Sequence, residues 1–141
     1  MDRNLISEFC TRAEGGGSSL TELMDLWLRA GIMRVRVDLI SVATFYYDAD
    51  DGSSMRRTNL LRGVRLRKTP SLSSALQALE RNRLDRISYA DFVIRIARSG
   101  YAGFSIFTKQ NIISLEGRGG EHMSLPVLVL PEQNEDSGRW R

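Results

Sequence analysis

Cysteine, histidine and lysine are scarce in this chain of 141 residues, and each shortage narrows the classes of site it can form. The single cysteine, Cys10, excludes a disulfide framework and a cysteine-based zinc site within the chain. The single histidine, His122, follows the glycine-rich segment 117–120, which we predict to be a mobile loop and therefore a poor position for a catalytic base. Walker, zinc and dinucleotide-binding motifs are missing, so we predict no cofactor, no metal ligand and no catalytic residue.

Long apolar runs are also missing. Stretches such as residues 127–130 are far shorter than the ~20 residues that span a bilayer. The first ten residues lack the apolar centre of a secretory signal. We therefore expect a soluble, cytoplasmic protein without a membrane partner.

Among the basic residues, arginine is strongly preferred to lysine. Only Lys68 and Lys109 are lysines among 20 basic residues, and the formal net charge is +3. Arginine makes planar, two-pronged contacts with phosphate and carboxylate groups that lysine does not make. A GC-rich genome favours arginine codons and would produce the same bias, so the preference alone does not establish binding.

The strongest pattern is a segment that occurs twice. Residues 88–115 align without a gap on residues 19–46, which lie 69 positions earlier. Ser88 then falls on Ser19 and Gly100 falls on Gly31. Pairs of apolar residues also coincide, namely Leu20/Tyr89, Leu23/Phe92, Met24/Val93, Trp27/Ile96, Leu28/Ala97 and Ile32/Tyr101. The shared pattern of apolar positions and stops indicates two similar structural units.

Each copy begins with the signature of a capped helix. Ser19 with Glu22, and Ser88 with Asp91, have the spacing of an N-cap residue and its partner three positions later. A glycine ends each helix. Apolar spacing predicts two more helices, at residues 4–13 and 72–83, the second with Leu72, Ala75, Leu76 and Leu79 facing inward.

Strands are predicted after each capped helix. Apolar and polar residues alternate over 33–39, which predicts a strand with one buried face and with Arg34 and Arg36 on its wet face. Further strands are predicted at 42–47, 64–67, 104–107, 112–115 and 125–130. The last should lie at a sheet edge, because Pro126 lacks an N–H donor. The acidic stretch 48–54 is predicted to be a turn, and no glutamate closes it as a calcium loop would require.

These elements predict one α+β domain over residues 1–131, built from two helix–helix–strand–strand–strand units at about 4–68 and 72–131. Neither unit has enough apolar surface to fold alone. We therefore expect the strands of both units to form one mixed or antiparallel sheet, covered by helices on one face, with Trp27 and Ile96 buried. Residues 132–141 are a polar tail that we predict to be disordered.

Three further stretches resemble a known family. They are FYYDAD at 45–50, ALQA at 75–78 and DRISYADF at 85–92. Their order resembles the YbcV-like family of small bacterial proteins, often labelled phage envelope proteins, over about residues 19–131. The resemblance implies a compact α+β domain without an established activity. Residues 79–86 lack the histidine and glycine that are usual there, and Leu115-Glu116 replaces an aromatic pair, so a functional histidine of the family has no counterpart.

The candidate binding residues are mostly basic. They are Arg34, Arg36, Tyr46, Arg56, Arg57, Arg62, Arg65, Arg67 and Lys68. No acidic residue lies between Asp51 and Glu80, so the basic segment 56–68 should attract phosphates or acidic protein. Arg34 and Arg36 add to it, beside Tyr46 or Tyr47. The same charges would also serve simply to keep a small domain soluble.

The sequence leaves three functional hypotheses open. The first is a small, non-enzymatic binding protein of unknown ligand. The second is an electrostatic binder of nucleic acid or of an acidic protein through residues 56–68. The third is an enzyme with a pocket between the two units, which requires polar groups such as Tyr46, Arg36 and Asp38 to converge.

Overall fold

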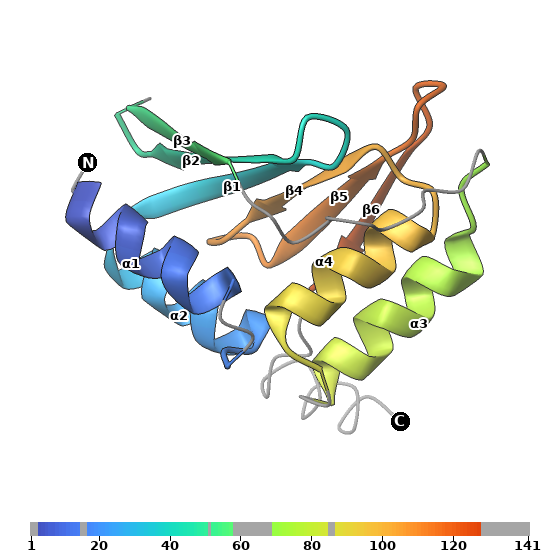
Figure 1. The fold of residues 1–141 in the computed structure, drawn as a ribbon, viewed down its shortest axis with the longest axis horizontal. Helices are drawn as coiled ribbons and strands as arrows, with labels where there is room; N and C mark the ends of the chain where they lie inside the picture. Colours follow the sequence, from blue (N-terminus) through green and yellow to red (C-terminus); the bar gives the residue numbers. More distant parts are fainter. Residues whose placement is uncertain (1–2, 15–16, 51, 58–68, 85–86, 128–141) are drawn as a thin grey trace, which may run out of the picture.

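The computed structural model describes residues 3–14, 17–50, 52–57, 69–84 and 87–127, and these form an α+β fold (Figure 1). Its helices are α1 (Arg3–Glu14), α2 (Leu20–Arg29), α3 (Leu72–Arg83) and α4 (Tyr89–Arg98). Its strands are β1 (Ile32–Asp38), β2 (Ala43–Asp48), β3 (Ser53–Arg57), β4 (Gly103–Phe107), β5 (Ile112–Glu116) and β6 (His122–Pro126). Two helices followed by three strands therefore occur twice along the described chain.

The strands form one antiparallel sheet in the order β3-β2-β1-β4-β5-β6. The first strand of each group, β1 and β4, pair at its centre, with Val35 opposite Ile106. This close pairing requires Gly103, because a Cβ atom there would lie 2.7 Å from the carbonyl oxygen of Val37. The predicted single sheet is confirmed, and it is antiparallel throughout.

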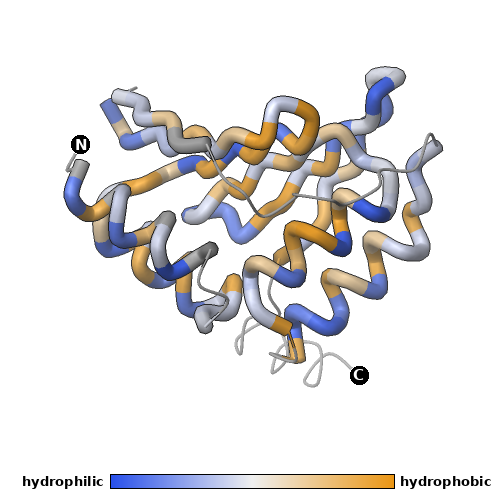
Figure 2. Tube along the Cα trace, in the orientation of Figure 1, coloured by the Kyte–Doolittle hydropathy of each residue, from blue (hydrophilic) through white to orange (hydrophobic). Residues whose placement is uncertain are grey.

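All four helices lie on one side of the sheet (Figure 1), and Figure 2 shows their apolar stretches alternating with polar ones along each helix. The core between the two layers contains Trp27, Phe92, Ile96 and Phe104, each with no exposed surface. The predicted burial of Trp27 and Ile96 is thus confirmed. The opposite side of the sheet carries no helix of the described chain.

The helix ends follow the predicted chemistry. The hydroxyl of Ser19 accepts a hydrogen bond from the Glu22 amide at 3.2 Å, and Ser88 accepts one from the Asp91 amide at 3.1 Å. Each bond satisfies a backbone donor that the helix itself leaves without a partner. Gly31 and Gly100 follow the two helices with φ of 80° and 95°, a left-handed conformation that glycine adopts without steric cost.

Two strand predictions were wrong in position. Strand β3 begins at Ser53, inside the segment predicted to be a turn, because the side chain of Asp48 closes a shorter turn by accepting hydrogen bonds from the amides of Asp50 and Gly52. Strand β6 begins at His122, so this residue lies in an edge strand and not in a loop, and Pro126 ends the strand. The edge position itself is confirmed.

The helical spacing of apolar residues in the sequence places Leu28 on an inner face as it does Leu76, and both predictions are wrong. The exposed fractions are 45% for Leu28 and 42% for Leu76. Ala78 and Asn82 take the inner positions of α3 instead, since the α3 face that packs against α4 is rotated from the predicted one. The strand predicted at 64–67 and the tail at 132–141 lie outside the described residues.

A candidate binding site on the open sheet face

Arginine and aromatic side chains lie on the side of the sheet that none of the four described helices covers. Side chains alternate between the two faces of a strand, so the burial of Val35 and Val37 places Arg34 and Arg36 on the other side. In the neighbouring strands, Tyr47 and Phe107 lie opposite Arg34. We call the surface formed by Arg34, Arg36, Phe45, Tyr47 and Phe107 the open face.

Arg34 is held between two aromatic rings. Its guanidinium carbon lies 5.3 Å from the ring centre of Tyr47 and 5.4 Å from that of Phe107. Its Nη2 donates a hydrogen bond of 3.1 Å to the hydroxyl of Ser105. Both distances to the rings are within the ~6 Å range of a cation–π attraction. The planar cation is therefore positioned by three strands: β2, β4 and its own β1.

The arrangement leaves one donor of Arg34 unsatisfied. Its Nε–H is shielded from solvent and has no hydrogen-bond partner among the described residues. Leaving a buried donor without a partner costs roughly 1–3 kcal/mol. The two ring contacts and the bond to Ser105 offset a cost of this size, so Arg34 is held in place with one donor left over.

Arg36, two residues further along β1 on the same face, also lies over an aromatic ring. Its guanidinium carbon lies 5.6 Å from the ring centre of Phe45. Next on the same face is Asp38, whose carboxylate accepts hydrogen bonds from the amides of Ile40 and Ser41. Partial burial raises the pKa of Asp38, but these bonds and the charge of Arg36 outweigh it, so the pKa lies below its ordinary value.

A shallow pocket of about 370 Å³ adjoins the open face where β1 begins. Its lining includes Arg34, Tyr47 and Phe107 of the open face. It also includes Ala49, in the turn between β2 and β3, and Gln110, in the turn between β4 and β5. We call it the end pocket. It joins a positioned cation, two aromatic rings and a side-chain amide in one small space.

The structure assigns the predicted binding residues to different places. Arg34 and Arg36 lie on the open face, where Arg34 contacts Tyr47 and Arg36 contacts Phe45. Tyr46 is buried on the helix side, with its ring 6.3 Å from that of Trp27, and does not join them. Arg56 and Arg57 belong to β3, but their side chains are not among those described. Arg62, Arg65, Arg67 and Lys68 lie outside the described residues.

Phe45 and Phe107 were missed by the sequence reasoning. Phe45 alternates with the buried Tyr46 and so lies on the open face, but no pattern within the strand shows which of these neighbours is buried. Phe107 carries no local signal either. It reaches Arg34 only because β1 and β4 pair, a contact between residues far apart in the chain.

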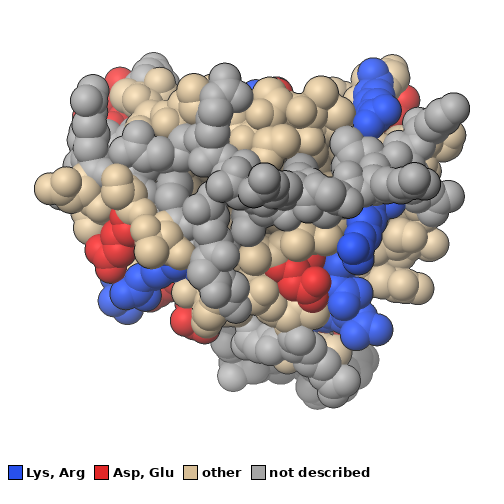
Figure 3. Space-filling view, viewed as in Figure 1, with Lys and Arg blue, Asp and Glu red and all other residues tan. Residues whose placement is uncertain are grey.

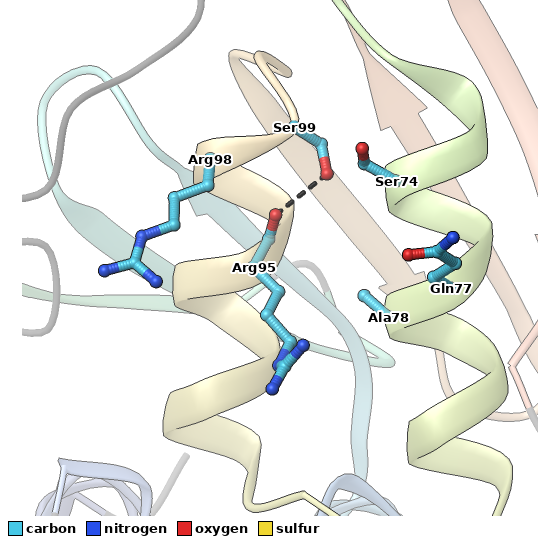
Figure 4. Close-up of a pocket in the computed structure, with 6 residues that line it drawn as sticks. All are labelled: Ser74, Gln77, Ala78, Arg95, Arg98 and Ser99. Carbon is cyan, nitrogen blue, oxygen red and sulfur yellow. Dashed lines mark hydrogen bonds between the residues drawn. The ribbon is translucent and has the colours of Figure 1, made fainter.

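A second pocket, of about 260 Å³, lies between α3 and α4 (Figure 4). Two of its polar groups are already engaged: the Ser99 hydroxyl donates to the carbonyl of Arg95 at 2.8 Å, and the Arg95 Nε donates to Asp91 at 3.0 Å. The guanidinium of Arg98 points away from α3 in this view. Basic and acidic side chains also lie beside one another on the side of the molecule shown in Figure 3. This pocket is the weaker candidate for an anion.

The described residues contain no group of three histidine, cysteine, aspartate or glutamate side chains able to hold a metal ion. Within the same part of the chain, no helix has the length and apolar character needed to cross a bilayer. Comparisons of the chain with protein-family models, curated proteins and solved structures gave no match.

Proposed function

We propose that this protein is a non-enzymatic binding protein whose open face binds single-stranded nucleic acid. The observation that supports this most is the pair of arginines positioned over aromatic rings on a sheet surface without covering helices. Arginine guanidinium groups bind phosphate, and aromatic rings on a sheet stack with unpaired bases. Single strands expose both partners at once, whereas a duplex shields its bases.

The neighbours of the rings favour stacking. Ser53 lies opposite Tyr47 on strand β3 and is small and exposed, and the exposed Met55 lies opposite Phe45 on the same strand. Ile112, opposite Phe107 on β5, is partly exposed and offers an apolar border. A strand of nucleotides crossing the sheet would meet aromatic and basic groups in alternation.

The basic segment 56–68 extends this proposal along the chain. It begins in β3, an edge strand of the same sheet, and holds six cations and no acid. Its charge would strengthen the attraction between the protein and a phosphate backbone.

Fluorescence anisotropy with a labelled, mixed-sequence single-stranded DNA, measured over a series of salt concentrations, tests the proposal. The affinity falls as salt rises, and each phosphate contact with a single strand makes the slope of log K against log salt steeper by about 0.7. The double variant Arg34→Ala/Arg36→Ala should therefore bind more weakly, and its slope should be less steep by about 1.4. The variant Arg34→Lys/Arg36→Lys should keep most of the slope but lose affinity, because lysine lacks the planar contact.

The matched control is Arg29→Ala/Arg98→Ala, which removes the same charge from the helix side, where both residues are exposed. Equal weakening by control and test variants would refute a site on the open face. If the protein binds polyglutamate but not DNA, its partner is an acidic protein and the nucleic-acid proposal fails. No binding of DNA by the natural chain at low salt would overturn it outright.

We also propose that the chain arose by internal duplication and belongs with the YbcV-like proteins that it resembles. The repeated order of elements, the paired serine caps and the two glycines with positive φ support a duplication. The arginines are confined to one unit: Gly103 and Ser105 occupy the positions 69 residues after Arg34 and Arg36. Binding through the open face would then be a property that one half acquired.

The enzyme hypothesis has less support. It required Tyr46, Arg36 and Asp38 to converge, but Tyr46 lies on the helix side of the sheet and the other two lie on the open face. Helices α2 and α4, one from each unit, meet through packed aromatic rings.

A further inference from the structure

We propose that the end pocket holds a single nucleotide, with its phosphate at Arg34 and its base toward Tyr47, Phe107 and Gln110. This inference rests on the proposed function, and it adds a site that would recognise one nucleotide individually. The volume of about 370 Å³ is at the small end of the range of ligand pockets, roughly 300–1,000 Å³, which suits one nucleotide and not a chain of them.

Arg34 supplies the charge. Arginine has five N–H donors in a planar fork, and Ser105 accepts from one of them. The contacts with the rings of Tyr47 and Phe107 hold the guanidinium in place, so less conformational entropy is lost when a phosphate binds. A phosphate bound to the guanidinium of Arg34 would form charge-assisted hydrogen bonds, which are stronger than hydrogen bonds between neutral groups.

Gln110 supplies a means of reading a base. It is exposed in the turn between β4 and β5 and lines the pocket together with Arg34. A side-chain amide both donates and accepts, so it matches the edge of a nucleobase. Asp48 also lines the pocket, and its Oδ1 accepts from the amides of Asp50 and Gly52. Its carboxylate would repel a phosphate, so the phosphate has to lie at Arg34 and not at this turn.

Ala49 offers a way to close the pocket without replacing any residue of the open face. It is exposed in the turn between β2 and β3, at a backbone conformation without positive φ. A phenylalanine there would fill the space beside Tyr47 and leave Arg34, Arg36 and Phe45 in place. Ala49→Phe is therefore the main test variant.

Isothermal titration and saturation-transfer NMR with AMP, adenosine and inorganic phosphate test the proposal. AMP should bind at least tenfold more tightly than either of the other two. Ala49→Phe should weaken AMP binding at least tenfold, and Gln110→Ala should weaken it by severalfold. Gln77→Ala, which changes an exposed glutamine in the pocket between α3 and α4, should have no effect.

The outcomes separate this proposal from the one on which it rests. If single-stranded DNA binds but AMP does not, the end pocket is not a nucleotide site and the open face remains one. Equal affinity for AMP and inorganic phosphate would remove the role of the base. Unchanged AMP binding in Ala49→Phe would place the nucleotide elsewhere and overturn the inference. If AMP binds but DNA does not, the pocket stands and the single-strand proposal fails.

Discussion

The indole ring of Trp27 meets the phenol ring of Tyr89 edge to face, with their centres 5.8 Å apart. Trp27 belongs to α2 and Tyr89 to α4, the helices that precede the two central strands. Both residues are buried, and the Trp27 ring also contacts Tyr46 of the sheet. This aromatic contact joins the first half of the chain to the second.

Replacing Trp27 with alanine should therefore destabilise the whole molecule. Truncating a fully buried tryptophan costs roughly 3–5 kcal/mol, because the cavity that remains is only partly refilled. Urea denaturation monitored by circular dichroism measures the change. Leu28→Ala, at the next residue but 45% exposed, is the control and should change stability by no more than about 0.5 kcal/mol. A similar loss in both variants would contradict the assigned core.

Replacing Gly31 or Gly103 with alanine should lower the stability of the protein, for a different reason at each position. At Gly31 a new Cβ would meet no atom within 4 Å, but φ is +80°, so Gly31→Ala should cost about 1–2 kcal/mol from backbone strain alone. At Gly103 the Cβ would lie 2.7 Å from the Val37 carbonyl oxygen, so the central pair of strands must separate. Thermal denaturation should show the larger loss for Gly103→Ala. Asparagine, which tolerates positive φ, should partly rescue position 31 but not position 103.

Asp38 should make stability depend on pH at the acidic end. Its folded-state pKa is below the ordinary value, so its contribution is complete above the unfolded pKa of about 3.9 and is lost as pH falls through the folded pKa. Asp38→Asn keeps an oxygen that can accept from Ile40 and Ser41 but carries no charge. The natural chain should exceed this variant in unfolding free energy at neutral pH.

That advantage should shrink as the solution is acidified below about pH 4. Urea unfolding of both proteins across this range measures it. A difference in stability that stays constant with pH would show that the charge of Asp38 contributes nothing.

The helices could be read from the sequence because their signals are local. Ser19, Ser88, Gly31 and Gly100 act on residues within one turn of themselves, and each has its expected role in the structure. Strand β3 could not be placed, because Ser53–Arg57 has little apolar alternation and is ordered by pairing with β2. Tertiary pairing overrides the weak preferences of such a segment.

Only part of the candidate site could be predicted from the sequence, because the rest depends on tertiary strand pairing. Alternation along β1 placed Arg34 and Arg36 on a common face. The contact of Arg34 with Phe107 depends on which strands become neighbours, and no pattern within either strand encodes that choice. Tyr46 was misjudged because two adjacent tyrosines point to opposite faces, and the register with β1 decides which one is buried.

The pairing of β1 with β4 also bears on how the molecule assembles. In the first half of the chain, β1 has β2 on one side, and in the second half, β4 has β5 on one side. The backbone N–H and C=O groups on the other side of β1 and of β4 pair with each other across the two halves. A separated half would present that row of groups to solvent and would tend to capture an equivalent strand from another molecule. Folding should therefore be cooperative over the whole sheet, and exchange of halves between two copies is the natural route to a dimer.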